Sequence, residues 1–178
     1  MFIGKRDYFL WLENPDVPYL NKLMIESFPF LMPRNRWSGD VVKNFDYSYN
    51  EMTMMPEPWA RAFGFEMLCE LERALREEGI LDQYRITDIK EKYGTLRWYD
   101  NCASERVFNI INKYCSMSID VCIYCGRPAY YQTQGWISYV CKKCARKQIK
   151  MGLYNKKSLV KLKTLKKEWS KYNEDDDE

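Results

Sequence analysis

The chain contains no histidine among its 178 residues. This absence excludes Ser–His and Cys–His nucleophile pairs, histidine-ligated catalytic zinc and the most common general base of enzymes. A zinc deaminase is excluded as well, because its His-x-Glu motif is missing and Val121 stands where its proline would precede a Cys-x-x-Cys pair. Neither a Walker loop nor a G-x-G-x-x-G motif occurs, so the sequence predicts no nucleotide-binding loop.

Long hydrophobic runs are also missing. The longest apolar stretches, such as YFLWL (8–12) and FPFLMP (28–33), are far shorter than the roughly 20 residues that cross a bilayer as a helix. The first apolar stretch is too short for a signal peptide and is not followed by a small-residue cleavage site. We therefore expect no membrane partner and a cytoplasmic location.

Internal repeats and Gly/Ser-rich linkers are absent, whereas bulky side chains are plentiful. Hydrophobic residues make up 46% of the chain and aromatic residues 16%, which is enough to fill a core. We expect an α+β fold in which helices pack on a small antiparallel hairpin. The predicted parts are an α+β body (1–118), a zinc-knuckle module (119–150), a basic amphipathic helix (151–173) and an acidic disordered tail (174–178).

Local signals predict the elements of the body. Pro58 suits the first turn of a long helix and Gly79 suits its end, while Ser104 is a suitable N-cap for another helix. Tyr93-Gly94 supplies the turn between two runs of alternating, strand-forming residues. The predicted elements are helices at 19–27, 57–78 and 104–116, a loop at 28–40 and a hairpin at 84–100.

Two Cys-x-x-Cys pairs provide the strongest motif. Cys122 and Cys125 are separated by fifteen residues from Cys141 and Cys144, which matches the C-x2-C-x15–20-C-x2-C spacing of zinc sites. Two residues between cysteines allow both thiolates to reach one ion, and Gly126 permits the backbone conformation of such a knuckle. Four thiolates leave no open position for water or substrate, so we predict one structural zinc per chain.

Two other uses of the four cysteines remain open. A redox dithiol would use one exposed pair of lowered pKa, but it would leave the second pair unexplained. An iron–sulfur cluster also takes four cysteines, although the symmetric spacing favours zinc. Two short strands around QTQG (132–135) fit a zinc ribbon or a treble-clef-like knuckle. The remaining cysteines, Cys69, Cys102 and Cys115, are predicted to be small core or loop residues.

Charge is distributed very unevenly. Residues 142–171, called here the basic arm, hold twelve Lys or Arg and one acidic residue, a net charge of +11. Residues 1–141 carry a net charge of −3, and the last five residues are all acidic. Helices are predicted at 144–154 and 158–172, the second with leucines on one face and lysines on the others. This asymmetry indicates a polyanionic partner.

Basic groups beside aromatic side chains suit phosphate contact with base stacking, mainly in RNA or single strands. A lysine-rich helix can also be an ordinary solvated surface, and the aromatics can form the core of the module, which we expect for Trp136. A host nucleoprotein such as a CRISPR effector is an equally suitable polyanionic partner. The candidate nucleic-acid or partner-binding residues are Arg127, Tyr131, Lys142, Lys143, Arg146, Lys147, Lys150, Lys156, Lys157 and Lys161.

One enzyme signature remains as an alternative. Asp88-Ile89-Lys90 has the acid-x-Lys form of a metal-dependent nuclease site, with Glu66, Glu70 or Asp82 as distant carboxylates. Three residues of common types also recur by chance, and a cross-strand ion pair would explain them without catalysis. We therefore predict no catalytic residues and no small-molecule substrate.

Several segments resemble a group of small proteins found in phage and prophage gene sets. In that group, a KEK-x-G-x-L-R-x-Y hairpin precedes a Cys-x-x-Cys-Gly knuckle, a Gly-Trp and a final knuckle. The corresponding segments here are KEKYGTLRWY (90–99), CIYCGRPA (122–129), GW (135–136) and CKKCA (141–145), and the upstream helix PEPWARAFGFEMLCELERAL (56–75) is similar too. Many members have Cys and His where this chain has Cys141 and Cys144, which keeps the ligand count at four.

The resemblance covers about residues 55–145 and implies a mobile-element origin and a bacterial cytoplasm. It transfers no catalytic residue. The function predicted from these features is a non-enzymatic zinc protein that binds nucleic acid or a host nucleoprotein, most concretely an anti-CRISPR-like inhibitor of a bacterial defence complex. The alternatives are the metal-dependent nuclease and a structural or regulatory phage protein that binds another protein through the 158–172 helix.

Overall fold

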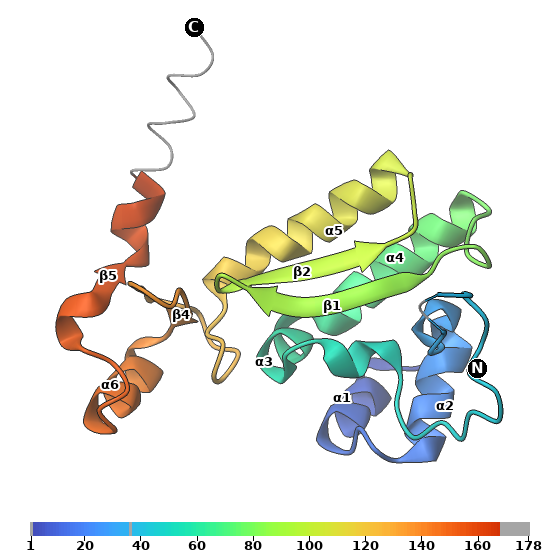
Figure 1. The fold of residues 1–178 in the computed structure, drawn as a ribbon, viewed down its shortest axis with the longest axis horizontal. Coiled ribbons are helices and arrows are strands. Elements are labelled where there is room, and N and C mark those ends of the chain that lie inside the picture. The colour runs from blue at the N-terminus through green and yellow to red at the C-terminus, as the bar shows by residue number, and fades with distance from the viewer. Residues whose placement is uncertain (1, 36, 168–178) are drawn as a thin grey trace, which may run out of the picture.

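A computed structural model describes residues 2–35 and 37–167 and confirms the α+β class. The body holds the N-terminal helices, one long interrupted helix, a hairpin and a further helix, and a cysteine module follows at residues 121–161 (Figure 1). The elements are α1 (Lys5–Glu13), α2 (Pro18–Ser27), η1 (Pro29–Leu31), η2 (Glu51–Met54), α3 (Glu57–Trp59), η3 (Ala60–Gly64), α4 (Phe65–Glu77), β1 (Ile86–Lys92), β2 (Thr95–Asp100), α5 (Glu105–Met117), η4 (Ser118–Asp120), β3 (Tyr131–Thr133), β4 (Tyr139–Val140), α6 (Lys142–Lys150), η5 (Lys156–Ser158) and β5 (Leu159–Lys161).

The first fifty residues fold against the long helix. The predicted helix at 19–27 is confirmed as α2, with Pro18 in its first turn. Asn21 is fully buried, where its Oδ1 accepts hydrogen bonds from Trp11 Nε1 at 2.9 Å and from Asn50 Nδ2 at 2.6 Å. Because these buried polar groups hydrogen-bond to one another, the bonds offset their desolvation and join α1, α2 and the segment before η2.

The predicted helix at 57–78 is present as three consecutive pieces, because its second piece, η3, is π-helical. The Ala60 carbonyl in this piece accepts a hydrogen bond from the buried Tyr8 hydroxyl at 2.8 Å. Gly64 leaves the space for that contact, since a Cβ there would overlap the Tyr8 hydroxyl and approach Met52 Cε at 2.6 Å. The π-helical piece is therefore held open by a side chain from α1.

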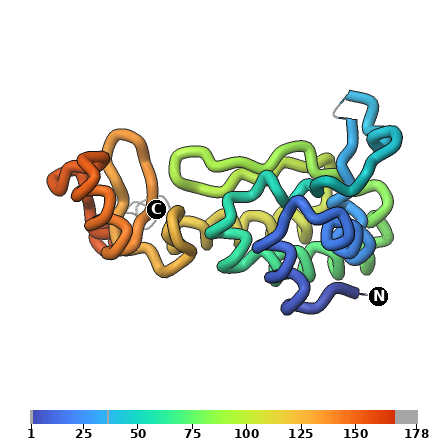
Figure 2. The backbone as a smooth tube through the Cα atoms, turned by 90° about the horizontal axis from the view of Figure 1, so that it is seen from below, coloured from blue at the N-terminus to red at the C-terminus, as the bar shows by residue number. Residues whose placement is uncertain are grey.

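The hairpin forms where the sequence predicts it. Tyr93 and Gly94 both have positive φ, 54° and 75°, as a type I′ turn requires. The Gly94 N–H donates to Glu91 Oε1 at 2.5 Å and fastens the turn. Helix α5 follows with Ser104 as its N-cap, as predicted, and the Ser104 hydroxyl accepts from the Val107 N–H at 3.2 Å. The hairpin forms one layer, and α4 and α5 cover one of its faces (Figure 2).

The C-terminal segment contains a second, three-stranded antiparallel sheet with strand order β4-β3-β5. Its presence corrects one prediction, because Leu159–Lys161 form strand β5 and not part of a helix over 151–173. One edge of β3 pairs with β4, and the other pairs with β5. Backbone hydrogen bonds from the Leu162 N–H to the Tyr130 carbonyl and from the Gln134 N–H to the Ser158 carbonyl extend the second pairing. Helix resumes only at residues 162–167. The rest of the predicted helix and the acidic tail at 174–178 lie outside the described residues.

The cysteine module contacts the body at the turn of the hairpin. A Cβ at Gly94 would lie 2.9 Å from the Tyr139 ring, and one at Gly126 would lie 3.0 Å from the Pro58 carbonyl oxygen. Glycine is needed at both points because each backbone also has a positive φ. The body and the module therefore meet through backbone-close contacts at one end of the hairpin (Figure 1, Figure 2).

Candidate metal centre

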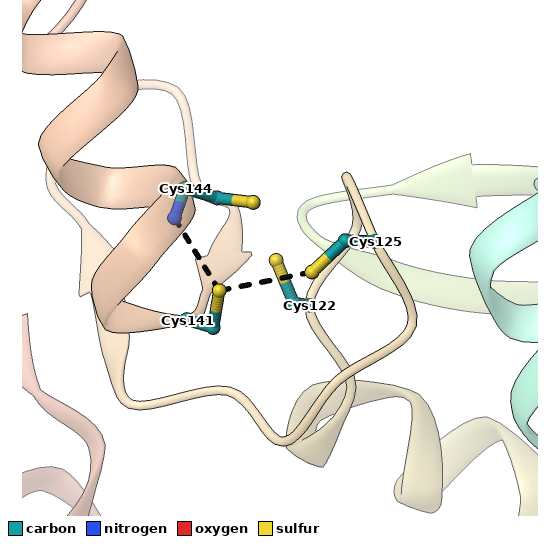
Figure 3. Close-up of side chains that lie close together, drawn as sticks. All are labelled: Cys122, Cys125, Cys141 and Cys144. Carbon is teal, nitrogen blue, oxygen red and sulfur yellow. Dashed lines mark hydrogen bonds between the residues drawn. The ribbon is translucent and has the colours of Figure 1, made fainter.

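Two separate segments bring the four predicted cysteines together (Figure 3). Cys122 and Cys125 lie in a tight turn, in which the Cys122 carbonyl accepts hydrogen bonds from the N–H groups of Cys125 at 3.2 Å and Gly126 at 2.9 Å. The Cys122 N–H donates to the Arg127 carbonyl at 2.7 Å and closes the turn. This local geometry directs both sulfurs toward the same side of the chain, as a metal-binding knuckle requires.

The second pair lies at the start of α6. Cys141 is the N-cap of this helix, and its Sγ accepts a hydrogen bond from the Cys144 N–H at 3.4 Å. The two sulfurs therefore lie side by side at the N-terminus of α6, where one short turn can present both to a single ion. Strands β3 and β4 connect the two pairs, and the Ile123 N–H ties the first turn to β4 through the Tyr139 carbonyl at 3.0 Å.

The spacing of the sulfurs suits one ion. All four Sγ atoms lie within 4.8 Å of one another, and those of Cys125 and Cys141 are 3.7 Å apart. Tetrahedral ligands at a zinc–sulfur distance of about 2.3 Å are about 3.8 Å apart. The cluster is half-enclosed, because Cys122 and Cys141 are buried while Cys125 and Cys144 are partly exposed. The residues thus form a possible site for a thiophilic metal.

Arg127 acts on the cluster directly. Its Nε donates to Cys125 Sγ at 3.5 Å. Burial alone would raise the pKa of Cys125, but hydrogen bonds from Arg127 and the neighbouring thiols outweigh burial and lower it to about 6. Burial instead raises the pKa of Cys122 and of Cys144. A bound cation would favour the thiolate form of all four, since metal binding releases thiol protons.

The other three cysteines are not part of the cluster. Cys69 lies on α4, Cys115 on α5 and Cys102 in the segment before α5, each partly buried against the core of the body. All seven cysteines are free thiols, and within residues 2–35 and 37–167 the four of the cluster form the one group that could hold a metal ion. The prediction that Cys69, Cys102 and Cys115 are small core or loop residues is confirmed.

The predicted basic residues lie around this cluster, and all of them are exposed. Lys142, Lys143, Arg146, Lys147 and Lys150 occupy α6, whereas Lys156 and Lys157 form η5 and Lys161 ends β5. Pairing of β3 with β5 places Lys161 opposite Tyr131, which the sequence alone did not indicate.

The aromatic residues of the module divide into two kinds. Tyr131 is partly buried and packs on the cysteine cluster. Tyr130, its edge-on neighbour, lies under the Lys142 ammonium at 4.0 Å from the ring centroid. The expectation that Trp136 belongs to the core of the module is wrong, because its side chain is 82% exposed in the loop between β3 and β4. This loop contains too few residues to fold over so large a ring.

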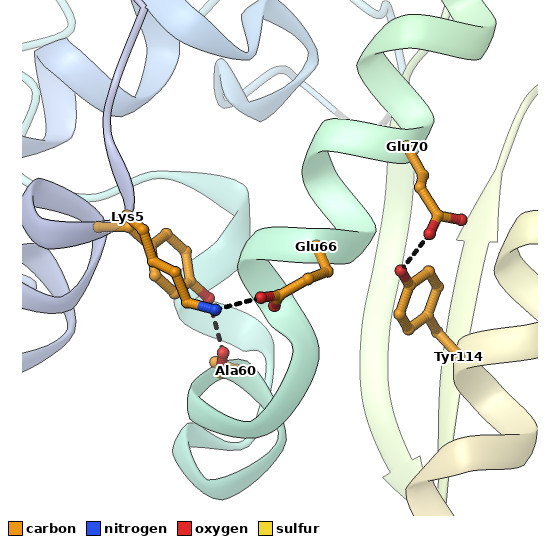
Figure 4. Close-up of polar contacts among 6 residues, drawn as sticks. Lys5, Ala60, Glu66, Glu70 and Tyr114 are labelled. Carbon is orange, nitrogen blue, oxygen red and sulfur yellow. Dashed lines mark hydrogen bonds and ion pairs between the residues drawn. The ribbon is translucent and has the colours of Figure 1, made fainter.

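The predicted nuclease residues form ion pairs of other kinds. Asp88 pairs with Lys90, two residues along the same strand, so the expected cross-strand pair is a same-strand pair. Glu66 pairs with Lys5, and Glu70 accepts from the Tyr114 hydroxyl at 2.8 Å (Figure 4). Glu70 also accepts from Lys113 Nζ at 2.7 Å. The two glutamates thus bind lysines of α1 and α5, while Asp88 pairs within the hairpin.

Hydrogen bonding also lowers the pKa of Glu70. Burial alone would raise its pKa, but the hydrogen bonds from Lys113 and Tyr114 outweigh burial, so the pKa of Glu70 is lowered. Burial raises the pKa of Tyr114, and its hydrogen bond to Glu70 raises it further. These contacts fasten α4 to α5 beneath the hairpin.

The chain matches no protein-family model, none of the curated proteins and none of the solved structures with which it was compared. In the described part of the chain, no helix combines the length and hydrophobicity needed to cross a membrane. Fold and site together define the class as an α+β protein with a C-terminal four-cysteine cluster that can accommodate a metal ion.

Proposed function

We propose that this protein is a non-enzymatic nucleic-acid-binding protein whose cysteine module is held together by one structural zinc ion. The observation that carries the proposal is the arrangement around the cysteine cluster. The helix that provides Cys141 and Cys144 also presents five exposed cations, and the loop between the two cysteine pairs presents an exposed tryptophan. A metal at the cluster would hold both features in fixed positions.

Zinc is proposed because of the donor set and its layout. Four thiolates favour zinc or iron–sulfur chemistry over calcium or magnesium, and the 3.7 Å separation of two sulfurs fits a single small ion. The first pair lies in a knuckle, a hairpin follows, and the second pair occupies the first turn of a helix. This order is that of a treble-clef site, which is the more specific of the two forms predicted from the sequence. Four-thiolate coordination is closed, so zinc there would have a structural role.

Nucleic acid is proposed as the partner because the module presents both cations and aromatic rings. Lys142 above Tyr130 combines a cation with a ring, and Trp136 exposes a large apolar surface without a packing reason within the module. Bases stack on such rings while phosphates contact the lysines, mainly in RNA or single strands. An acidic protein would satisfy the lysines without base stacking, so the contribution of the rings distinguishes the two kinds of partner.

Binding can be tested with a fluorescein-labelled oligouridine and fluorescence anisotropy over a series of salt concentrations. Wild type should bind with an affinity that falls steeply with salt. Trp136→Ala should weaken binding about tenfold, because one stacked base contributes about 1–3 kcal/mol. Trp37→Ala is the matched control, since the Trp37 side chain is also highly exposed, at 97%, but lies in a loop of the body. A wild type that binds no RNA or DNA would refute the proposal.

The absence of catalysis is a separate part of the proposal. Incubation of labelled RNA and DNA with magnesium or manganese should leave both intact. Turnover that is lost in Asp88→Ala would instead support the nuclease alternative.

The more specific target, proposed from the resemblance to phage and prophage proteins, is a bacterial nucleoprotein such as an RNA-guided effector. Purified protein should then inhibit such an effector stoichiometrically, and Asp88→Ala should inhibit it equally. Pulldown from a bacterial host with and without nuclease treatment distinguishes capture through nucleic acid from capture through protein. Inhibition that is catalytic and needs Asp88 would contradict this form of the proposal.

A further inference from the structure

The β1–β2 hairpin has one face covered by helices and one open face. Ile89, Leu96 and Trp98 lie on the covered face and are buried in the core of the body. Alternation along both strands places the next set of side chains on the opposite side, called here the outer face. In Figure 2 the hairpin is one layer and helices α4 and α5 lie on one side of it. The outer-face residues are Asp88, Lys90, Lys92, Thr95, Arg97 and Tyr99.

Charge on the outer face is mostly positive and is placed unfavourably for an isolated hairpin. The strand register puts Lys90 directly opposite Arg97, with Lys92 next on the same face. Like charges in directly opposed positions destabilise a strand pair. Asp88 pairs with Lys90, but no carboxylate among the described residues forms an ion pair with Arg97 or Lys92. Two cations on one face that form no ion pair with the described residues suit a binding surface for an anion.

Aromatic rings lie among these cations. Tyr99 is 43% exposed, and the Lys90 ammonium lies 5.0 Å from its ring centroid. Tyr93 in the turn is 66% exposed, with the Lys92 ammonium at 5.5 Å from its ring centroid. Each ring therefore has a cation beside it, the combination that contacts bases and phosphates in single-stranded nucleic acid.

The turn at the end of the outer face contacts the cysteine module. The turn glycine, Gly94, approaches the Tyr139 ring so closely that a Cβ there would lie 2.9 Å from it, and 3.1 Å from the Ile137 carbonyl oxygen. Ile137 directly follows the exposed Trp136 in the chain. The turn of the hairpin and the tryptophan loop of the module therefore meet at one point on the surface.

We infer that the outer face of the hairpin is a second nucleic-acid-binding surface, which takes a single strand that continues onto the cysteine module. Lys90, Lys92 and Arg97 contact phosphates, and Tyr93 and Tyr99 stack on bases. The inference rests on the proposed nucleic-acid-binding function and adds a surface to it. It also assigns roles within the KEKYGTLRWY segment. Leu96 packs in the core, Glu91 accepts a hydrogen bond from the turn, and the exposed residues contact nucleic acid.

The test compares charge-matched double variants of the full-length, zinc-loaded protein. Lys92→Gln with Arg97→Gln removes two cations from the outer face. The control, Arg6→Gln with Arg73→Gln, removes two exposed cations from α1 and α4. Anisotropy with labelled oligouridine is measured between about 50 and 200 mM salt. The hairpin variant should bind about tenfold more weakly, and its log–log salt slope should be shallower by about 1.4 than that of wild type, because two single-strand phosphate contacts are lost.

Three results would overturn the inference, and they separate it from the proposed function. If the hairpin variant and the control bind equally while Trp136→Ala binds more weakly, the hairpin inference is refuted and the module alone is the binding site. If wild type does not bind, both the inference and the proposed function are refuted. If polyglutamate displaces the probe with the same potency as unlabelled oligouridine at equal charge, the surface binds acidic chains in general and base stacking does not contribute. Unchanged melting temperatures and zinc content in both double variants show that they are folded.

Discussion

Replacing one cysteine of the cluster tests whether a metal holds the module. Cys125→Ser is the best choice because Cys125 is only partly buried, so that the loss of core packing is small. The variant removes one of four thiolates and leaves the hydrogen-bonded turn in place. Cys69→Ser is the matched control, since Cys69 is also partly buried but lies on α4, away from the cluster.

The size of the effect follows from how little else holds the module. The buried cluster around the cysteines consists of Cys122, Val140, Cys141 and Ala145, and Tyr139 and Leu162 are the other buried hydrophobic residues among residues 121–167. Full burial of an aliphatic side chain such as Val140 contributes only about 1.5–3 kcal/mol. A structural zinc site contributes about 10–16 kcal/mol of apparent binding free energy in small domains. Loss of the metal should therefore unfold the module, whereas the separate core of the body should stay folded.

Elemental analysis and amide hydrogen exchange measure this outcome. Wild type and Cys69→Ser should each contain about one zinc per chain, and Cys125→Ser should contain almost none. In Cys125→Ser, amides of β3, β4 and α6 should exchange rapidly while those of α4 and β1 keep their protection. Chelation of wild type should have the same effect. A metal-free protein that protects the module as well as the body would refute the reasoning.

Three further substitutions test the body and its joint with the module. Gly64→Ala should lower the melting temperature by about 5 °C, because a Cβ there overpacks against Tyr8 and Met52 at a cost of about 1–3 kcal/mol. Gly4→Ala is its control, and an unchanged melting temperature of Gly64→Ala would contradict the close contact. Gly94→Ala and Gly79→Ala both place alanine at positive φ, at a cost of about 1–2 kcal/mol each, but only at Gly94 would the new Cβ meet a ring, that of Tyr139. Gly94→Ala should therefore lower the free energy of unfolding more in denaturant titrations. Equal decreases would count against the contact between the hairpin turn and the module. Glu70 has a lowered pKa, so its contribution is present above its unfolded value near 4.5 and is lost as pH falls through the folded pKa. The stability difference between wild type and Glu70→Gln should accordingly shrink below pH 4.5, and a difference that grows there would overturn the assignment.

Local signals in the sequence were sufficient for the elements that depend on local chemistry. Gly94 predicts the hairpin turn because glycine adopts a positive φ without steric cost, as the second central position of this turn requires. Ser104 predicts the start of α5 because its hydroxyl satisfies a free N–H of the first turn. The spacing of Cys122, Cys125, Cys141 and Cys144 predicts a cluster because two short turns can reach one point.

Features that depend on distant parts of the chain could not be predicted in this way. Leucines at 159, 162 and 165 have helical spacing, yet the open edge of β3 supplies backbone partners that convert the first of them to strand. The exposure of Trp136 depends on how short the loop between β3 and β4 is once both strands have paired. The outer face of the hairpin could not be predicted because Arg97 follows Lys92 by five residues and Lys90 by seven, and only the strand register places Lys90 opposite Arg97.

The metal centre and the hairpin are linked through Tyr139. This residue lies in β4, directly before Val140 and Cys141, and its ring packs against the turn at Gly94. A metal that fixes Cys141 therefore also fixes the position of the Tyr139 ring, which contacts the hairpin turn. If one strand of nucleic acid contacts both surfaces, the fixed joint raises the effective concentration of the second contact once the first has formed. Zinc would then strengthen binding without touching the ligand, and chelation should weaken binding of a long oligonucleotide more than that of a short one confined to the hairpin.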